Sequence, residues 1–266
     1  MKKLFLFALF AALCCSCTES GTDENTDPNG GSNSGQTTPP DPDSDAKDVI
    51  HVPKGGMLAG ILNELGLKSP SSLKLSGTLG VSDFTTLRNI QSLEHLDISR
   101  VNLSVLPTEA FLECTNIKSV ILPNTLTAIG TQAFWGSSLV SISIPASVEE
   151  IRGSAFFGCS SLKTVTFEKG SKLKTISNGA FAFCWALTTV DMSACTQVTV
   201  IGEYAFSDDS KLQLFKIGTR TPPSCGNDVF TGINSYSVLK VPAGCVDAYK
   251  KAYYWKEFTT ISELDE

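Results

Sequence analysis

Residues 151–167 read I-R-G-S-A-F-F-G-C-S-S-L-K-T-V-T-F, and residues 176–192 read I-S-N-G-A-F-A-F-C-W-A-L-T-T-V-D-M. Both stretches place Ile, Ala-Phe, Cys, Leu and Val at the same positions. In the first stretch Val165 and Phe167 stand two apart, which is the period of a β-strand with one buried face. A unit this short cannot bury its apolar side chains alone, so the pattern predicts that successive units stack on one another.

The same pattern recurs along most of the chain. The Ala-Phe pair stands at residues 110–111, 133–134, 155–156, 180–181 and 205–206, with Val-Phe at 229–230. A residue of the Leu/Ile/Cys type precedes each Phe by five positions, and apolar residues follow in the spacing L-x-x-V-x-F. We therefore predict an α/β solenoid with a parallel sheet on one side, short helical or 3₁₀ turns on the other, and a cap at each end.

The spacing resembles the leucine-rich-repeat scheme L-x-x-L-x-L, and the A-F-x-x-C variant resembles the BspA-like family, surface lipoproteins of Gram-negative anaerobic bacteria. The tail V-P-A-G-C-V-D-A-Y-K-K-A-Y-Y-W-K-E-F (241–258) is similar to the terminal helical cap of that family. The resemblance covers residues 104–264. It implies a leucine-rich-repeat solenoid with a curved parallel β-sheet and a cell-surface location. It also implies that some members bind host matrix proteins.

The beginning of the chain has the features of an export signal. Lys2 and Lys3 precede an apolar run from Leu4 to Leu13, which is too short to span a bilayer. Ser16-Cys17 follows and resembles a lipoprotein cleavage site, so we predict that Cys17 is lipidated. Cleavage before Cys15 and an ordinary export signal are the alternatives.

Residues 18–48 contain no Leu, Ile, Val, Met or aromatic residue, and they carry eight acids and one lysine. Such a segment cannot bury enough apolar surface to offset its conformational entropy, so it is predicted to be a disordered tether. The expected organisation is a signal peptide (1–17), the tether (18–48), a leading cap with the first repeat-like strands (49–103), BspA-like repeats (104–242) and a helical end cap (243–266).

Composition excludes several kinds of function. The net charge of −6 and pI of about 5.0 leave no basic field for nucleic acid, and without the first 48 residues the chain holds 18 bases and 19 acids. The sequence contains two histidines and no nucleotide-binding or zinc-protease motif. We expect a non-enzymatic protein with no cofactor and no metal site; His95 and Asp97 are interpreted as a surface pair, since no nucleophile is evident.

Three cysteines share one repeat position, three residues after the Phe, and Cys225 takes the Ile position of the last unit. Interior positions suit small apolar groups, so buried free thiols are predicted. A Cys159–Cys184 disulfide is the alternative, because adjacent strands bring such positions close. Cys245, near an expected helix start, is predicted to be more accessible. The three cysteines that share the repeat position after the Phe are Cys114, Cys159 and Cys184.

Outward strand positions converge on the concave face of such a solenoid. The predicted binding face consists of Ser141, Ser143, Thr164, Thr166, Thr189 and Asp191. We expect an outer-membrane, lipid-anchored monomer at the cell surface that contacts the membrane only through its lipid. Its expected function is protein binding, with adhesion to host proteins as the role. The alternatives are glycan or peptide capture for a neighbouring outer-membrane transport system and, in third place, a hydrolase.

Overall fold

The computed structural model describes residues 48–265. The predicted signal peptide, the lipidation at Cys17 and all of the predicted tether except Asp48 lie outside these residues. Within the described part of the chain, no helix combines the length and the apolar content that crossing a bilayer requires.

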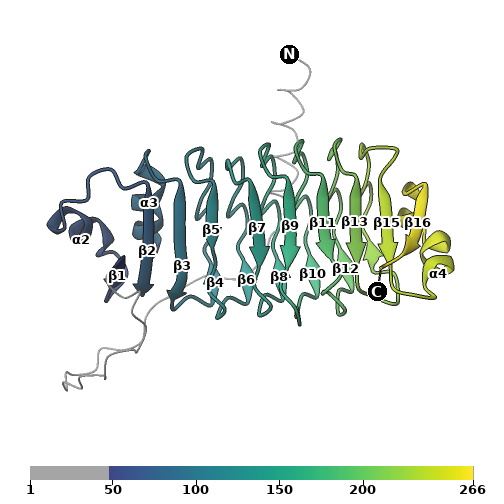
Figure 1. Ribbon diagram of the computed structural model, residues 1–266, viewed down its shortest axis with the longest axis horizontal. Helices are drawn as coiled ribbons and strands as arrows, with labels where there is room; N and C mark the ends of the chain where they lie inside the picture. The colour runs from purple at the N-terminus through teal and green to yellow at the C-terminus, as the bar shows by residue number, and fades with distance from the viewer. Residues whose placement is uncertain (1–47, 266) are drawn as a thin grey trace, which may run out of the picture. The chain divides into compact units, whose positions relative to one another are not determined.

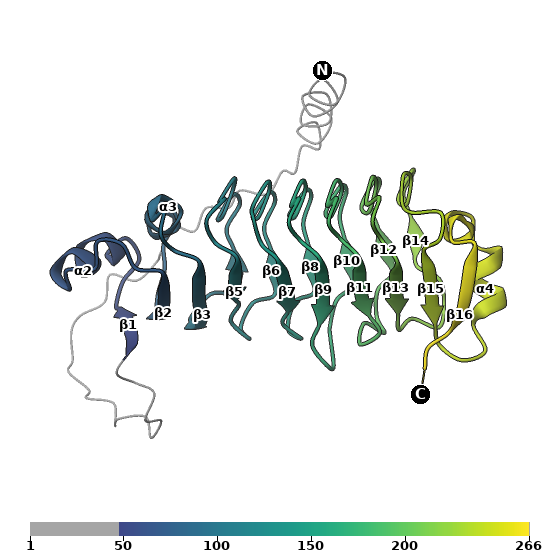
Figure 2. The same ribbon diagram turned by 45° about the horizontal axis from the view of Figure 1, so that its top comes forward.

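Val49–Glu263 form a stack of coils in which every paired strand is parallel to its neighbour (Figures 1 and 2). This confirms the predicted fold class. The leading sheet has the order β1-β2-β3-β5, the long-strand sheet β7-β9-β11-β13-β15-β16, and the short-strand sheet β4-β6-β8-β10-β12-β14. The leading sheet contains β1 (Val49–Val52), β2 (Ser72–Gly77), β3 (His95–Val101) and β5 (Ser119–Ile121).

The other two sheets take one strand from each coil. The long-strand sheet contains β7 (Ser141–Ile144), β9 (Thr164–Phe167), β11 (Thr189–Met192), β13 (Leu214–Ile217), β15 (Val238–Val241) and β16 (Thr260–Glu263). The short-strand sheet contains β4 (Val105–Leu106), β6 (Ala128–Ile129), β8 (Glu150–Ile151), β10 (Thr175–Ile176), β12 (Val200–Ile201) and β14 (Ser224–Cys225). Register pairs each repeat position with its equivalent in the next coil, such as Val165 with Val190.

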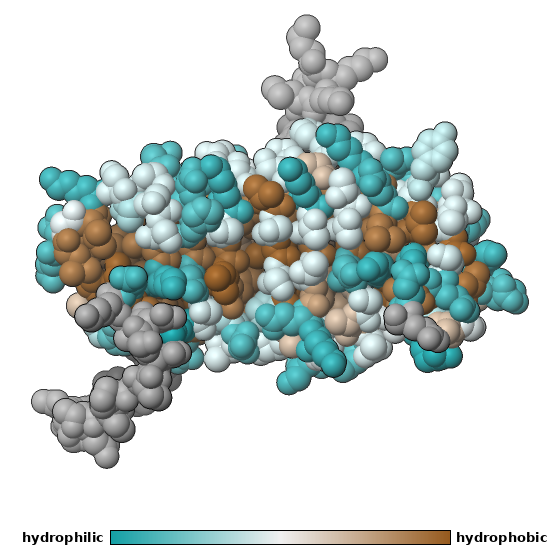
Figure 3. Space-filling model, in the orientation of Figure 1, coloured by the Kyte–Doolittle hydropathy of each residue, from teal (hydrophilic) through white to brown (hydrophobic). Residues whose placement is uncertain are grey.

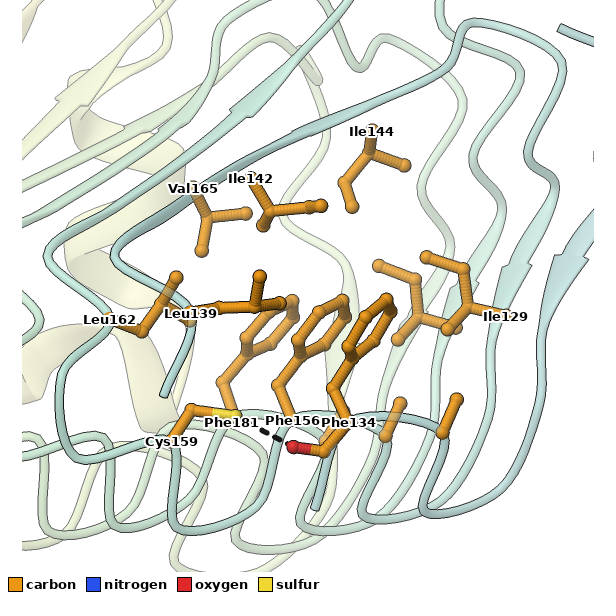
Figure 4. Packing of buried hydrophobic residues seen from close by; sticks show 14 of the residues in the cluster. Ile129, Phe134, Leu139, Ile142, Ile144, Phe156, Cys159, Leu162, Val165 and Phe181 are labelled. Carbon is orange, nitrogen blue, oxygen red and sulfur yellow. Dashed lines mark hydrogen bonds between the residues drawn. The ribbon is translucent and has the colours of Figure 1, made fainter. Parts of the chain in front are cut away.

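The Phe residues of the Ala-Phe pairs form a continuous stack inside the coils, part of which Figure 4 shows. Neighbouring ring centroids lie 4.9–5.8 Å apart with interplanar angles of 3–16°. Phe84 closes one end of the stack edge-on, and Phe258 closes the other. The stack therefore links both caps through one core. Its members are Phe111, Phe134, Phe156, Phe181, Phe206 and Phe230.

The Ala-Phe segments are tight turns with a regular backbone. In all six coils the residues two before and two after the Phe have a positive φ of 52–78°. Only four of these twelve positions are glycine: Gly136, Gly158, Gly179 and Gly232. A residue other than glycine in the left-handed conformation costs roughly 1–2 kcal/mol, so contacts with the rest of the structure must stabilise each turn.

Hydrogen bonds between coils supply that constraint. The amides of Ser154, Phe156 and Gly158 donate to carbonyls of the next coil over 2.7–2.9 Å, and the intervening amides close i+3→i turns within the coil. The first five coils repeat this arrangement. The expected helical or 3₁₀ turns are thus i+3→i turns interrupted by left-handed residues. Every second amide is thereby free to join the coils.

The leading cap contains α2 (Leu58–Glu64) and α3 (Val81–Asn89). Asp83, buried in the first turn of α3, accepts hydrogen bonds from the amides of Gly56, Leu58 and Gly80 over 2.6–2.9 Å. The carboxylate therefore ties the starts of both helices together. Helix α3 begins at Val81, so Asp83 lies within its first turn.

The end cap differs from the expected helical cap. It consists of α4 (Val246–Lys251), a 3₁₀ turn η2 (Tyr254–Glu257) and the strand β16, which pairs with β15. The added strand covers the edge that β15 would otherwise expose. Tyr249, Trp255 and Phe258 are buried against the last coil.

All six cysteines in the described part of the chain are free thiols, including Cys159 and Cys184. The Cys159 Sγ donates to the Phe134 carbonyl oxygen over 3.0 Å, which Figure 4 shows, and Cys184 makes the equivalent bond to Phe156. The prediction for Cys245 was wrong: this residue is buried at the start of α4, because the end cap packs against it. Cys225 is the most exposed of the six.

Candidate functional site

The six residues predicted to form a binding face lie together on the long-strand sheet. Register places Ser141, Thr164 and Thr189 in one row across β7, β9 and β11, and Ser143, Thr166 and Asp191 in the next row. Their side chains alternate with buried apolar residues of the core, so all six face away from it. We call these six residues the hydroxyl face.

Asp191 supplies the charge of the hydroxyl face, but it is already engaged. Its Oδ2 accepts a hydrogen bond from Lys216 Nζ at 3.0 Å, and its Oδ1 accepts from the Ser193 amide and hydroxyl. Partial burial raises the pKa of this carboxyl, yet the hydrogen bonds from Ser193 and Lys216 outweigh it and leave the pKa below its usual value. The face is therefore neutral around Asp191.

On β13 and β15, the outward row that contains Asp191 continues with charged side chains instead of hydroxyls. Lys216 on β13 pairs in register with Lys240 on β15, and Lys240 contacts Asp265 at 2.5–2.6 Å. Lys216 and Lys240 are thus neighbours, and each forms an ion pair with an acid, Lys216 with Asp191 and Lys240 with Asp265. The sequence placed both lysines outward, but it gave no signal for the Lys240–Asp265 ion pair, since Asp265 follows an unexpected strand.

The two histidines each contact a serine on the neighbouring strand. His95 Nδ1 lies 2.8 Å from Ser119 Oγ, and His51 Nδ1 lies 3.2 Å from Ser76 Oγ. The sequence did not indicate these hydroxyl partners. Asp97 does not orient His95, because its carboxylate accepts the amide hydrogen of Ser99 at 2.9 Å. In addition, the backbone amides of a parallel sheet lie in the sheet plane, so none is directed at a substrate oxygen above it.

Residues 48–265 contain no cluster of three His, Cys, Asp or Glu side chains that could hold a metal ion. Asp209 is a buried acid. It takes the repeat position, three residues after the Phe, that cysteine occupies in other coils. Its Oδ1 accepts the Cys184 amide at 2.9 Å, while its Oδ2 has no hydrogen-bond partner. Burial raises the pKa of this carboxyl well above its usual value. The group is enclosed in the core, so it has no route to a ligand.

Sequence reasoning missed an aromatic cluster on the turn side of the coils. Trp135 and Phe157 have ring centroids 4.5 Å apart, Phe157 and Phe183 5.1 Å, and Phe183 and Trp185 6.4 Å. Phe183 is one of the left-handed residues, with a φ of 61°. Phe157 and Phe183 are buried, whereas Trp185 is 38% exposed. We call these four residues the turn-edge aromatics.

The family model described as the BspA type leucine rich repeat region matches the chain in six copies, over residues 82–213 and 129–259. No curated protein matches the chain.

Several solved structures are similar to the chain. A leucine-rich repeat protein from Bacteroides ovatus is 22% identical, with 73% of this chain and 59% of that chain covered and a TM-score of 0.36. The leucine rich repeat protein of T. pallidum is 23% identical, with coverages of 59% and 81% and a TM-score of 0.42. A leucine rich cell surface protein from Faecalibacterium prausnitzii is 17% identical, with coverages of 74% and 73% and a TM-score of 0.30. The chain spans about three fifths of the length of the Bacteroides ovatus protein.

Proposed function

The chain belongs to the BspA-type leucine-rich repeat family, and from this premise we propose that it is a non-enzymatic surface lipoprotein whose solenoid binds other proteins, with adhesion to host proteins as its role. Leucine-rich repeat proteins generally serve as scaffolds for protein interaction. The adhesive role, the lipid anchor and the cell-surface location are the parts of the proposal that go beyond the family.

The observation that carries the proposal is the hydroxyl face. Five hydroxyl groups and one neutralised carboxylate stand in register on three adjacent strands, without a bulky side chain among them. Such a surface can make hydrogen bonds with a polar partner. It lacks the Trp, Tyr and Arg anchors that dominate tight interfaces, so each contact should be weak. Many copies on one cell would strengthen binding through multivalency.

The sequence supports lipid anchoring. Ser16-Cys17 follows the apolar run from Leu4 to Leu13, and residues 18–48 supply a tether to the first strand. Intact mass spectrometry of the protein purified from membranes tests this directly. The expected mature chain begins at Cys17 and carries acyl chains, whereas a chain without acyl groups would exclude the anchor.

Glycan capture is the second candidate, and the turn-edge aromatics favour it. Indole rings pack well against the apolar faces of sugars, and Trp185 is partly exposed on the turn side of the coils. Peptide capture for a neighbouring transport system would use the hydroxyl face instead, with the same polar contacts as an adhesive partner.

Two binding measurements separate the candidates. The purified protein is passed over a panel of immobilised extracellular-matrix proteins and is applied in parallel to a glycan array. Saturable binding to a matrix protein supports adhesion, and binding confined to the array supports glycan capture. Turnover of an ester, peptide or glycoside substrate that is lost in Ser119→Ala would contradict the non-enzymatic assignment.

A further inference from the structure

The leading cap carries a second apolar stripe, of which Met57 and Leu65 are exposed, whereas Ile61 between them packs partly against the core. Met57, Ile61 and Leu65 follow one another at four-residue spacing, and the amides of Ile61 and Leu65 bond to the carbonyls of Met57 and Ile61. They therefore lie on one side of the helix. Leu58 and Leu62 form the neighbouring stripe, which is buried in the core.

The side chains around this stripe are unusually exposed for apolar residues. Met57 is 44% exposed, Leu65 57% and Leu67 39%, and Val81 at the start of α3 is 73% exposed. Val81 precedes Ser82, whose hydroxyl lies beside Gly56, so it belongs to the same end of the cap. In Figure 3 hydrophobic surface runs as a band along the molecule and includes the end that Figure 1 labels α2. We call Met57, Leu65, Leu67 and Val81 the cap patch.

The large apolar residues exposed at the two ends differ in kind, because the leading cap exposes aliphatic side chains, whereas the last coil and the end cap expose Tyr236 and Tyr253, whose hydroxyls can contact water. At the other end Tyr249, Trp255 and Phe258 are buried, and β16 covers the sheet. The end cap thus seals its coil, while the leading cap seals the core with one stripe of α2 and exposes another. Clustered exposed apolar residues on a soluble domain usually mark a contact surface.

The charge of the leading cap differs from that of the tether. The leading cap, residues 49–103, holds five bases and four acids, and one of the acids is Asp83, which is buried and bonded to three amides. Lys54, Lys68 and Lys74 are exposed. Residues 18–48, in contrast, hold eight acids and one lysine. Lys54 and Lys68 lie just before and just after α2 in the chain, and lysines near an apolar helix face suit an interfacial contact with anionic lipid.

The position of the cap in the chain identifies the occupant. The folded part begins at β1, directly beside α2, so the end that carries the cap patch is the end joined to the predicted anchor. If the predicted tether of 31 residues is a flexible chain, it would span roughly 30 Å on average and would keep this end close to the bilayer. Contrary to the expectation of a contact through the lipid alone, we propose that the leading cap also rests on the lipid surface that holds the anchor, with the cap patch in the headgroup region and Lys54 and Lys68 beside it. The proposal rests on the lipid anchor of the proposed function.

The acylated full-length protein in vesicles tests this contact. Vesicles of phosphatidylethanolamine and phosphatidylglycerol are prepared with part of the lipid carrying brominated acyl chains, which quench nearby indole fluorescence. Leu65→Trp places a reporter in the cap patch, and Tyr236→Trp places a matched reporter at an 85% exposed position of the last coil. The account expects a blue shift and quenching for Leu65→Trp only. In a Met57→Ser/Leu67→Ser background this quenching should be lost, with the melting temperature unchanged.

Flotation of the same vesicles separates the two claims. Protein that floats without selective quenching of Leu65→Trp keeps the anchor and overturns the cap contact. Protein that does not float overturns the anchor, and the cap contact falls with it. Sedimentation that finds a dimer abolished by Met57→Ser/Leu67→Ser would also overturn the membrane contact, since a second copy would then cover the cap patch.

Discussion

Phe156 and Phe181 stack with their ring centroids 4.9 Å apart and their planes within 3° of each other, although 25 residues separate them in the chain. The ring spacing matches the distance between adjacent parallel strands, so the stack and the sheets repeat with one period. One aromatic ring per coil therefore sets how the coils stack. Substitutions of this ring should consequently lower the free energy of unfolding strongly.

Phe156→Ala should destabilise the solenoid strongly. The substitution removes a fully buried ring from the middle of the stack and leaves a cavity between Phe134 and Phe181. Such changes cost about 3–5 kcal/mol. Urea unfolding followed by circular dichroism measures the loss. Tyr236→Ala, at an exposed position, serves as the control and should change the free energy of unfolding by less than about 0.5 kcal/mol.

The left-handed turns make a second, purely backbone prediction. Gly136 has a φ of 63°, and a Cβ added there would lie 3.6 Å from its nearest neighbour, so space is available. Gly136→Ala should nonetheless lower the free energy of unfolding by about 1 kcal/mol, because alanine resists this conformation. Gly153 has equal room but no positive φ. Equal effects of Gly136→Ala and Gly153→Ala would show that backbone strain does not matter at the turns.

Asp209 should make stability fall as the pH rises. The pKa of its carboxyl in the folded protein lies above the unfolded value, so its stabilising contribution is complete below the unfolded pKa of about 3.9 and is lost as the pH rises through the folded pKa. Asp209→Asn keeps an oxygen for the Cys184 amide and removes the charge. Its melting temperature should exceed that of the wild type at pH 8, by an amount equivalent to about 1–3 kcal/mol, and the difference should narrow at pH 4.

The control for this experiment is the neighbouring acid. Asp208→Asn changes a partly exposed carboxyl that contacts Ser207, and asparagine also tolerates its left-handed backbone. Because the charge of Asp208 itself contributes to the raised pKa of Asp209, Asp208→Asn should reduce the pH dependence of melting only slightly, and much less than Asp209→Asn does. A pH profile of Asp209→Asn that runs parallel to that of the wild type would mean that Asp209 is not the responsible group.

The thiols should react slowly in the folded protein. Burial raises the pKa of Cys195 and of Cys225 to about 12, so little reactive thiolate exists at neutral pH. Mass spectrometry after timed alkylation should show Cys225 as the first of the described cysteines to be labelled, because it is the least buried. All six should be labelled after denaturation without reductant. Resistance of Cys159 and Cys184 to that step would reveal a disulfide.

The repeat could be predicted from the sequence because every coil has the same strand period and nearly the same length, so equivalent residues recur at regular intervals. Ile151 and Ile176, for instance, pair in register as their shared position requires. The left-handed positions could not be read in this way, since eight of the twelve carry side chains such as Glu113 or Tyr204. There the hydrogen bonds between coils, which are properties of the stack, override local preference.

Some parts of the candidate site could likewise be predicted from the sequence, and others could not. The hydroxyl face was predictable, because outward strand positions repeat with the coil. The turn-edge aromatics were not, since their rings come from three different repeat positions and meet only when the coils are stacked. Asp209 was overlooked because its slot holds cysteine in three other coils, and β16 because its four residues follow a helical cap.

The central claim is that partners bind through the hydroxyl face, and matched charge substitutions test it most directly. Ser141→Lys/Thr166→Lys/Thr189→Lys places three lysines on this face without opposing two of them across adjacent strands. Thr115→Lys/Ser160→Lys/Ser210→Lys adds the same charge at exposed positions of the turn edge. Surface plasmon resonance against the immobilised matrix-protein panel should show micromolar binding by the wild type and the turn-edge variant, and none by the sheet variant, with equal melting temperatures. Binding that survives in the sheet variant and disappears in the turn-edge variant would contradict the claim and place the partner at the turn-edge aromatics.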